Sequence, residues 1–213
     1  MPDRFPGYDV LAKRHTPSWN EKTREVINKR LSLSPEPQFL TVEELALVKA
    51  IADRIVPQPK NRPPIPVATL IDHQLQSNEG DGYRQPTMPP VREAWRRGLR
   101  ALNAEAMRAY GASFDRLSGE DQDKLIAAMP ADELKDPAWE GMKPSTFFKS
   151  RMARDVVHAY YGHPTAWNEI GWGGPASPRG YVRMGYNERD PWEAAEVKDG
   201  DVEAARRKNR NVG

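Results

Sequence analysis

The sequence predicts an all-α protein, an irregular helical domain of about five to seven helices with long Pro-, Gly- and aromatic-rich connectors and a C-terminal segment of the same kind. Apolar residues recur at spacings of three and four in several segments, which is typical of amphipathic helices. Twenty prolines divide the 213 residues into short segments. The nearest candidate for a strand, GYVRMGY at residues 180–186, is too short and glycine-rich to predict one.

The N-terminal part is expected to form an arm followed by one helix. Residues 1–17 contain three prolines, which indicates an extended arm. Residues 18–31 are then expected to be helical, because Ser18 and Glu21 fit a capping box. The apolar stripe of this helix is sparse and consists of Trp19, Val26, Ile27 and Leu31.

The clearest helix begins after Leu40. Thr41 and Glu44 fit a capping box, and Leu40 stands at the hydrophobic staple position. Pro57 ends the helix. Its apolar face consists of Leu45, Val48, Ile51, Ala52 and Ile55.

Three further helices are expected in the middle of the chain. A short one covers residues 67–76. The longest one has Pro90 as its first residue and stops at Gly111, because Pro suits the first turn and Gly the left-handed cap. Ser118 caps the third, and Pro130 ends it.

A last helix is expected over residues 145–159, capped by Ser145 and ended by Gly162 and Pro164. The basic run RRKNR near the end of the chain indicates a solvated tail. The predicted organisation is an N-terminal arm and helix at 1–39, a helical domain at 40–192 and a charged C-terminal tail at 193–213.

The composition excludes several classes of function. The chain has no Cys, which removes disulfides, cysteine-ligated zinc and covalent c-type haem. A net charge of +2 gives no case for nucleic-acid binding. No apolar run has the length of a membrane span. The N-terminus has neither an apolar core nor paired arginines, so no export signal is expected. The protein is expected in the cytoplasm, or in the periplasm if a partner carries it there.

No catalytic motif stands out. The dinucleotide-binding, P-loop and HExxH patterns are missing, and GWGGP at residues 171–175 is expected to be a turn. Asp155 and His158 are three residues apart and fit either a general-base pair or a helix-surface hydrogen bond. His158 and His163 fit either a metal site or structural histidines, and His163 lies beyond the helix end.

The most informative segment is residues 147–192, which is irregular yet rich in aromatic residues. A disordered segment is usually poor in aromatics, so these rings must pack against the protein's own core or against a partner. Tyr, Trp and Arg dominate binding hot spots, which favours a partner surface. The interface candidates are Tyr160, Tyr161, His163, Trp167, Trp172, Tyr181, Arg183, Tyr186 and Trp192.

At these residues the chain resembles a known family, the small subunit (subunit 3, or gamma) of gluconate 2-dehydrogenase-type flavoprotein complexes. The most specific likeness is the pattern YYGHP…W..IGW.GP within residues 147–175. Residues 40–57, 67–75 and 101–126 also carry it, so that it spans roughly residues 40–192.

The resemblance implies a non-catalytic helical subunit that binds and helps to fold a large FAD-dependent dehydrogenase of the glucose–methanol–choline type. That partner oxidises a sugar or sugar acid, and a cytochrome c subunit usually takes the electrons. The FAD then belongs to the partner, with no cofactor and no catalytic residue on this chain. Many members carry a twin-arginine export signal, from which this sequence departs. The alternatives are a stand-alone enzyme with a histidine, carboxylate or metal site, and a general scaffold protein.

Overall fold

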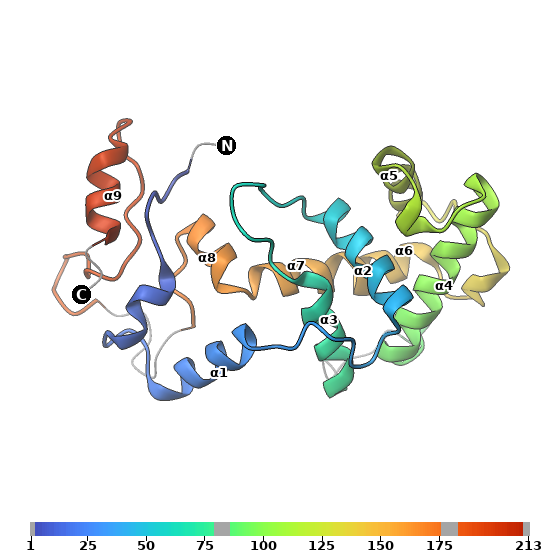
Figure 1. Cartoon of the computed structure of the whole chain (residues 1–213), viewed down its shortest axis with the longest axis horizontal. Helices are drawn as coiled ribbons and strands as arrows, with labels where there is room; N and C mark the ends of the chain where they lie inside the picture. The colour runs from blue at the N-terminus through green and yellow to red at the C-terminus, as the bar shows by residue number, and fades with distance from the viewer. Residues whose placement is uncertain (1–2, 79–85, 176–182, 211–213) are drawn as a thin grey trace. The chain divides into compact units, whose positions relative to one another are not determined.

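The computed structural model describes residues 3–78, 86–175 and 183–210, and every regular element in these ranges is helical. The all-α prediction is therefore confirmed (Figure 1). The chain forms two compact units. Unit 1 combines the two ends of the chain, residues 1–32 and 161–213, and unit 2 is residues 33–160. These units do not coincide with the ranges 1–39, 40–192 and 193–213, which stay predictions about domains.

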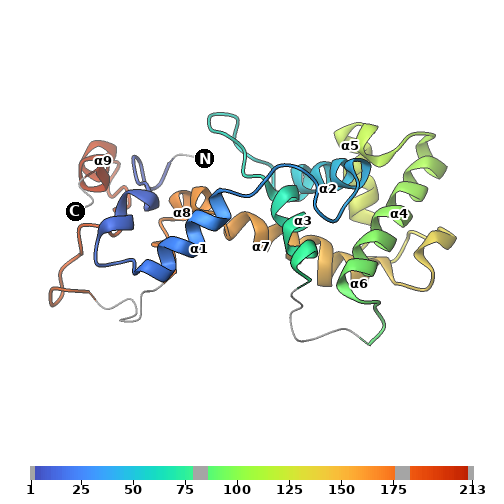
Figure 2. The ribbon, with the colours of Figure 1, turned by 60° about the horizontal axis from the view of Figure 1, so that its bottom comes forward.

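Unit 2 is a group of helices around α2 (Val42–Ile55), which lies between α3 and the pair of α4 and α5 (Figures 1 and 2). The other elements of this group are α3 (Val67–Ser77), α4 (Val91–Tyr110), η2 (Phe114–Arg116), α5 (Gly119–Ala128) and η3 (Pro137–Trp139). Val48, Ile51 and Ala52 of α2 are buried, as the predicted apolar face requires.

Several predicted helix ends in unit 2 are confirmed. The Thr41 hydroxyl accepts a hydrogen bond from Glu44 N at 3.1 Å, and the Glu44 carboxylate accepts one from Thr41 N at 3.0 Å. Ser118 caps α5, and Gly111 ends α4 with a left-handed φ of 69°. Pro90 precedes the first residue of α4 instead of occupying it, because its ψ of 152° is not helical.

The entry into α2 is fixed by the buried carboxylate of Asp72 on α3. This carboxylate accepts hydrogen bonds from three successive backbone N–H groups, those of Gln38 at 2.6 Å, Phe39 at 3.0 Å and Leu40 at 2.7 Å. These hydrogen bonds join the segment before α2 to α3, and they connect residues that are more than thirty positions apart in the sequence.

An aromatic cluster fills the centre of unit 2. Trp95 on α4 meets Phe147 edge-on, with ring centroids 5.6 Å apart, and Trp139 lies 6.2 Å from the same ring. Gly98, one turn after Trp95, leaves room for that ring: an added Cβ would stand 2.3 Å from Phe147 carbons. Glycine in mid-helix is therefore required by packing here, despite its poor helix propensity.

The last helix of unit 2 differs from the predicted one. It consists of α6 (Pro144–Phe147), the π-helical turn η4 (Phe148–Met152) and α7 (Ala153–Tyr161). Ser145 is not the cap: Pro144 takes the first turn, and Ser145 donates from N and Oγ to the Asp132 carboxylate. The π turn widens the helix at the point where Arg151 and Met152 enter the core.

Unit 1 contains η1 (Val10–His15), α1 (Glu21–Leu31), α8 (Pro164–Ile170) and α9 (Val202–Arg210). Three sequence-based expectations fail here. The arm is not simply extended, because η1 forms within it. Asn20, not Ser18, caps α1 by accepting from Thr23 N at 2.8 Å. The segment with the basic run forms α9, in which Ala205 and Asn209 are buried. Helix α8 was not predicted, because Gly162 and Pro164 indicate a stop.

The two ends of the chain meet in unit 1, where α9 lies beside the N-terminal segment (Figure 1). The buried amide of Asn209 donates to Pro6 O at 3.0 Å and exchanges hydrogen bonds with both backbone groups of Ala195. Arg4 adds an exposed ion pair with Glu196.

Candidate partner interface

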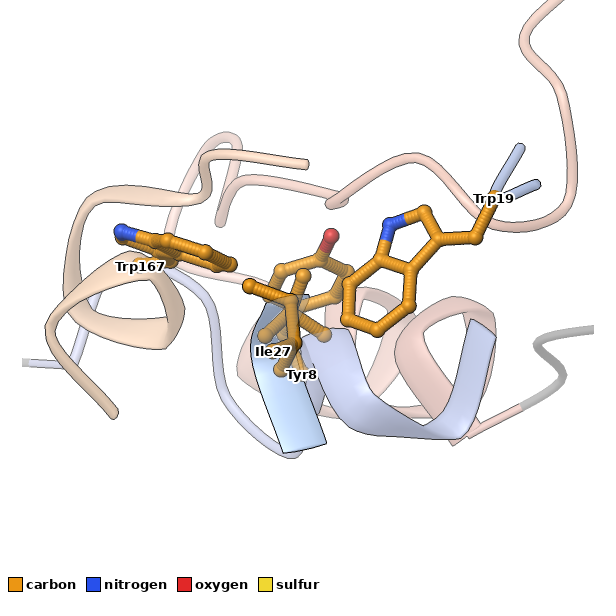
Figure 3. Packing of buried hydrophobic residues seen from close by; sticks show 5 residues of the cluster. Tyr8, Trp19, Ile27 and Trp167 are labelled. Carbon is orange, nitrogen blue, oxygen red and sulfur yellow. The ribbon is translucent and has the colours of Figure 1, made fainter. Parts of the chain in front are cut away.

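The site around α8 is built on the core of unit 1. Trp167 on α8 packs with Tyr8, Trp19 and Ile27, together with Val10, and all five are buried (Figure 3). In this view the Tyr8 ring lies between the two indoles. The N-terminal segments therefore supply most of the core on which the α8 segment rests.

The turn after α8 fits closely onto these rings. Gly171 ends α8 with φ 66°, and an added Cβ would stand 2.5 Å from the ring of Phe5. Gly174 has φ 79°, a backbone conformation that favours glycine. A Cβ at this position would also lie unusually close to two indoles, 3.0 Å from Trp167 and 3.3 Å from Trp19. The Trp19 indole N–H donates to Gly173 O at 3.3 Å. The expected turn is therefore present. Gly171 is required there by the ring of Phe5 and Gly174 by the two indoles, and both have a positive φ.

Trp172 projects from this turn with 38% of its surface exposed. Its ring stands edge-on to Trp167, with centroids 4.7 Å apart. Two further apolar side chains near α8 are exposed, Tyr161 at 45% and Ile170 at 48%. The carbonyl of Tyr161 accepts a hydrogen bond from the Trp167 indole at 2.6 Å. We call Tyr161, Ile170 and Trp172 the α8 apolar surface. Ile170 was not among the predicted candidates, because it reads as an ordinary helix residue.

Three predicted candidates are buried instead. Tyr160 lies in unit 2, where its hydroxyl accepts from Arg62 Nη2 at 2.9 Å. Trp167 is 1% exposed. His163 precedes α8, and its Nδ1 accepts from Thr165 N at 3.3 Å, which caps the helix. These side chains build the protein's own structure in the isolated chain.

The remaining candidates lie further along unit 1. Tyr181 falls outside the described residues. Arg183 forms an ion pair with Glu193, with Nε and Oε1 3.0 Å apart. Tyr186 is 99% exposed, and Trp192 is half-buried. The structure thus divides the predicted set into core residues and surface residues, and it leaves their role toward a partner as a prediction.

The alternative histidine site gains no support from the geometry. The Asp155 carboxylate is buried, accepts from the Trp95 indole N–H at 2.8 Å and stands 3.8 Å from Arg151 Nη1. His158 is exposed. Among the described residues, no three His, Asp or Glu side chains are grouped in a way that could hold a metal ion. Asp155 is best described as the centre of a buried polar cluster in unit 2.

One titratable group in the core below this surface is strongly shifted. Burial raises the pKa of Tyr8 to about 12, and the positive charge of Arg189 acts in the opposite direction. No described group lies within hydrogen-bonding distance of the Tyr8 hydroxyl. The hydroxyl is therefore kept neutral by its apolar surroundings.

The described ranges thus define an all-α protein with exposed apolar side chains around a glycine-rich turn. None of their helices combines the length and the apolar character needed to cross a bilayer. The family model of gluconate 2-dehydrogenase subunit 3 matches residues 42–174, more than half of the chain. The chain belongs to this family, whose name suggests an accessory subunit of a dehydrogenase complex. No curated protein and no solved structure matches it.

Proposed function

We propose that this chain is a non-catalytic small subunit that binds an FAD-dependent sugar or sugar-acid dehydrogenase and supports its folding and stability. Membership of the gluconate 2-dehydrogenase subunit 3 family supports this proposal. In the proposed complex, the large subunit holds the FAD and performs the oxidation, and a cytochrome c subunit accepts the electrons. This chain supplies a binding surface and no reacting group.

The observation that best supports the proposal is the α8 apolar surface. Trp172 is already held by its contact with buried Trp167, so that its ring loses little conformational freedom when a partner covers it. Exposed Trp and Tyr rings of this kind are the commonest anchors of protein interfaces. An obligate interface would bury on the order of 2,000 Å² in total, of which this surface would be the centre.

The test is affinity purification of the tagged full-length chain from its native cell, with an absorption spectrum of the eluate. We expect a co-purifying chain of dehydrogenase size and the absorption bands of a bound flavin. Trp172→Ala is expected to weaken the complex by at least ~2 kcal/mol, roughly 30-fold, without changing the helical circular dichroism signal.

The matched control is Tyr110→Ala. Tyr110 ends α4 in unit 2 and is 40% exposed, close to the exposure of Trp172. This variant should recover the flavoprotein as well as the unmodified chain does. A colourless, cooperatively folded monomer from the native cell would contradict the proposal. Co-purification of proteins without flavin would instead favour a general scaffold.

A further inference from the structure

A hollow on the surface of unit 2 carries an unusual concentration of positive charge. It has a volume of about 340 Å³ and is lined by Phe39 and by five residues of α4. These five are Arg92, Glu93, Arg96, Arg97 and Arg100. The lining has four arginines and one glutamate, a net charge of +3 in a chain whose net charge is only +2. We call it the arginine hollow.

The helical repeat explains why these cations gather. Arg92, Arg96 and Arg100 follow one another at intervals of four residues and therefore share one face of α4. The ring of Phe39 lies beside the first two, with the guanidinium carbons of Arg92 and Arg96 at 5.0 Å and 4.2 Å from its centroid. Both distances fall in the range of cation–π interactions, so that the aromatic ring fixes the two cations.

Backbone carbonyls orient the same two guanidinium groups. Arg92 donates from Nε and Nη2 to the carbonyls of Leu75 and Gln76, at 2.7 Å and 2.6 Å. Arg96 donates from Nη2 to Phe39 O at 3.0 Å. Each guanidinium has five N–H donors in a fixed plane, so that further donors remain for a ligand. The cations are thus held in place before any ligand arrives.

The neighbouring arginines already bind carboxylates of this chain. Arg97 forms an ion pair with Glu93, and Glu140 lies 3.3 Å from Arg97 and 2.9 Å from Arg100. Glu44 stands 3.9 Å from Arg96. With Glu44 and Glu140 included, the cluster still has a net charge of +1. The part with the least carboxylate around it is the Arg92–Arg96 pair beside Phe39.

We propose that the arginine hollow docks an acidic segment of the large subunit, with a carboxylate on Arg92 and Arg96 and the methylene groups of the same side chain on Phe39. Cations beside an aromatic ring suit a glutamate side chain, which has an apolar stem and a planar anionic end. The identity of the partner rests on the proposed function, whereas the binding chemistry does not. The hollow belongs to unit 2, so that it is a second contact besides the α8 apolar surface.

The binding chemistry is tested on the full-length chain with a fluorescein-labelled hexaglutamate peptide, by fluorescence anisotropy at low and high salt. We expect saturable binding that weakens as salt rises. Arg96→Ala should bind several-fold more weakly, and the double variant Arg92→Ala/Arg96→Ala, which removes both proposed contacts, at least about tenfold more weakly. Arg96→Lys keeps the charge but loses the planar fork, and it should also bind more weakly.

Arg116→Ala is the matched control, because it removes one exposed arginine of unit 2 outside the hollow. This variant should change the affinity by less than about twofold. Equal losses in Arg116→Ala and Arg96→Ala would mean unspecific attraction and would overturn the proposal. Displacement of the peptide by inorganic phosphate at equal affinity would assign the hollow to a free anion and would also overturn it.

Purification of the complex separates this proposal from the proposed function. If the unmodified chain and the double variant recover the flavoprotein equally well, even in high salt, the arginine hollow is not a contact of the complex and the proposed function stands. If the unmodified chain recovers no flavoprotein, the proposed function fails, and the peptide titration still decides whether the hollow binds acidic segments.

Discussion

The indole of Trp172 stands edge-on to the indole of Trp167, with ring centroids 4.7 Å apart and ring planes at 86°. Trp167 is 1% exposed and Trp172 is 38% exposed. The pair therefore joins the core of unit 1 to its surface. Because one ring supports folding and the other is proposed to bind, substitutions of the two should have different effects.

Trp167→Ala is expected to lower the free energy of unfolding by about 3–5 kcal/mol, because a fully buried indole leaves a cavity among Tyr8, Trp19 and Ile27. Urea unfolding followed by far-ultraviolet circular dichroism measures this loss. Trp172→Ala is the comparison and should cost less than about 1.5 kcal/mol. Similar losses in both variants would show that Trp172 is part of the core.

Gly98→Ala is expected to destabilise the protein by about 1–3 kcal/mol, although Ala is the better helix former by about 1 kcal/mol. The reason is that the added methyl would stand 2.3 Å from the Phe147 ring. Thermal unfolding of unit 2 measures the effect. Gly119→Ala makes the same exchange against the flexible end of Arg54 and should change the stability little. A stabilised Gly98→Ala variant would contradict the packing of Phe147.

The stability of unit 1 is expected to fall above pH 10. Burial raises the pKa of Tyr8 to about 12, while tyrosine in an unfolded chain has a pKa of about 10. Between these values the unfolded chain loses the phenolic proton and the folded chain keeps it. The contribution of Tyr8 to the free energy of unfolding is therefore complete below pH 10. It decreases as the pH rises toward 12, by roughly 2–3 kcal/mol in total.

Tyr8→Phe provides the control, because it keeps the ring and removes the titrating group. The difference in unfolding free energy between the two proteins, measured from pH 8 to pH 12, isolates Tyr8 from the other tyrosines and lysines. The variant should lose less stability than the unmodified protein over this range. Parallel pH curves would show that the Tyr8 hydroxyl is accessible to water in the folded state.

Asp72→Asn is expected to cost about 1–3 kcal/mol, because a single amide oxygen replaces two carboxylate oxygens that accept from Gln38, Phe39 and Leu40. Chemical unfolding measures the loss. Asp53→Asn, an exposed change on α2, should stay within about 0.5 kcal/mol. If Asp72→Asn is equally harmless, the entry into α2 is held by its apolar contacts alone.

Local signals in the sequence predicted several helix ends of unit 2 and missed the π turn in its last helix. The capping box of Thr41 and Glu44, the cap at Ser118 and the stop at Gly111 depend only on residues within one helical turn. The same reasoning misplaced the start of α1, because Ser18 and Asn20 are both good caps and the choice depends on the buried position of Trp19.

Unit 1 was much harder to predict, because its contacts join residues far apart in the sequence. The basic run of α9 predicts a solvated tail, because no residue near Asn209 in the sequence indicates its hydrogen bond to Pro6 O. The aromatic composition of residues 147–192 drew attention to the α8 segment, whose role toward a partner stays a prediction. It did not separate buried Trp167 from exposed Trp172, because burial depends on Tyr8 and Trp19, more than 140 residues earlier.

The Asn209 contact has a consequence for the synthesis of this protein. Residues 33–160 make unit 2 by themselves, and this unit can fold while the ribosome is still translating the rest of the chain. Asn209 donates to Pro6 O, so that this contact of the first segment of unit 1 forms only after α9 has left the ribosome. Until Trp167 has also been synthesised, Tyr8 and Trp19 lack the ring that completes their core, so that this segment of the nascent chain exposes apolar side chains.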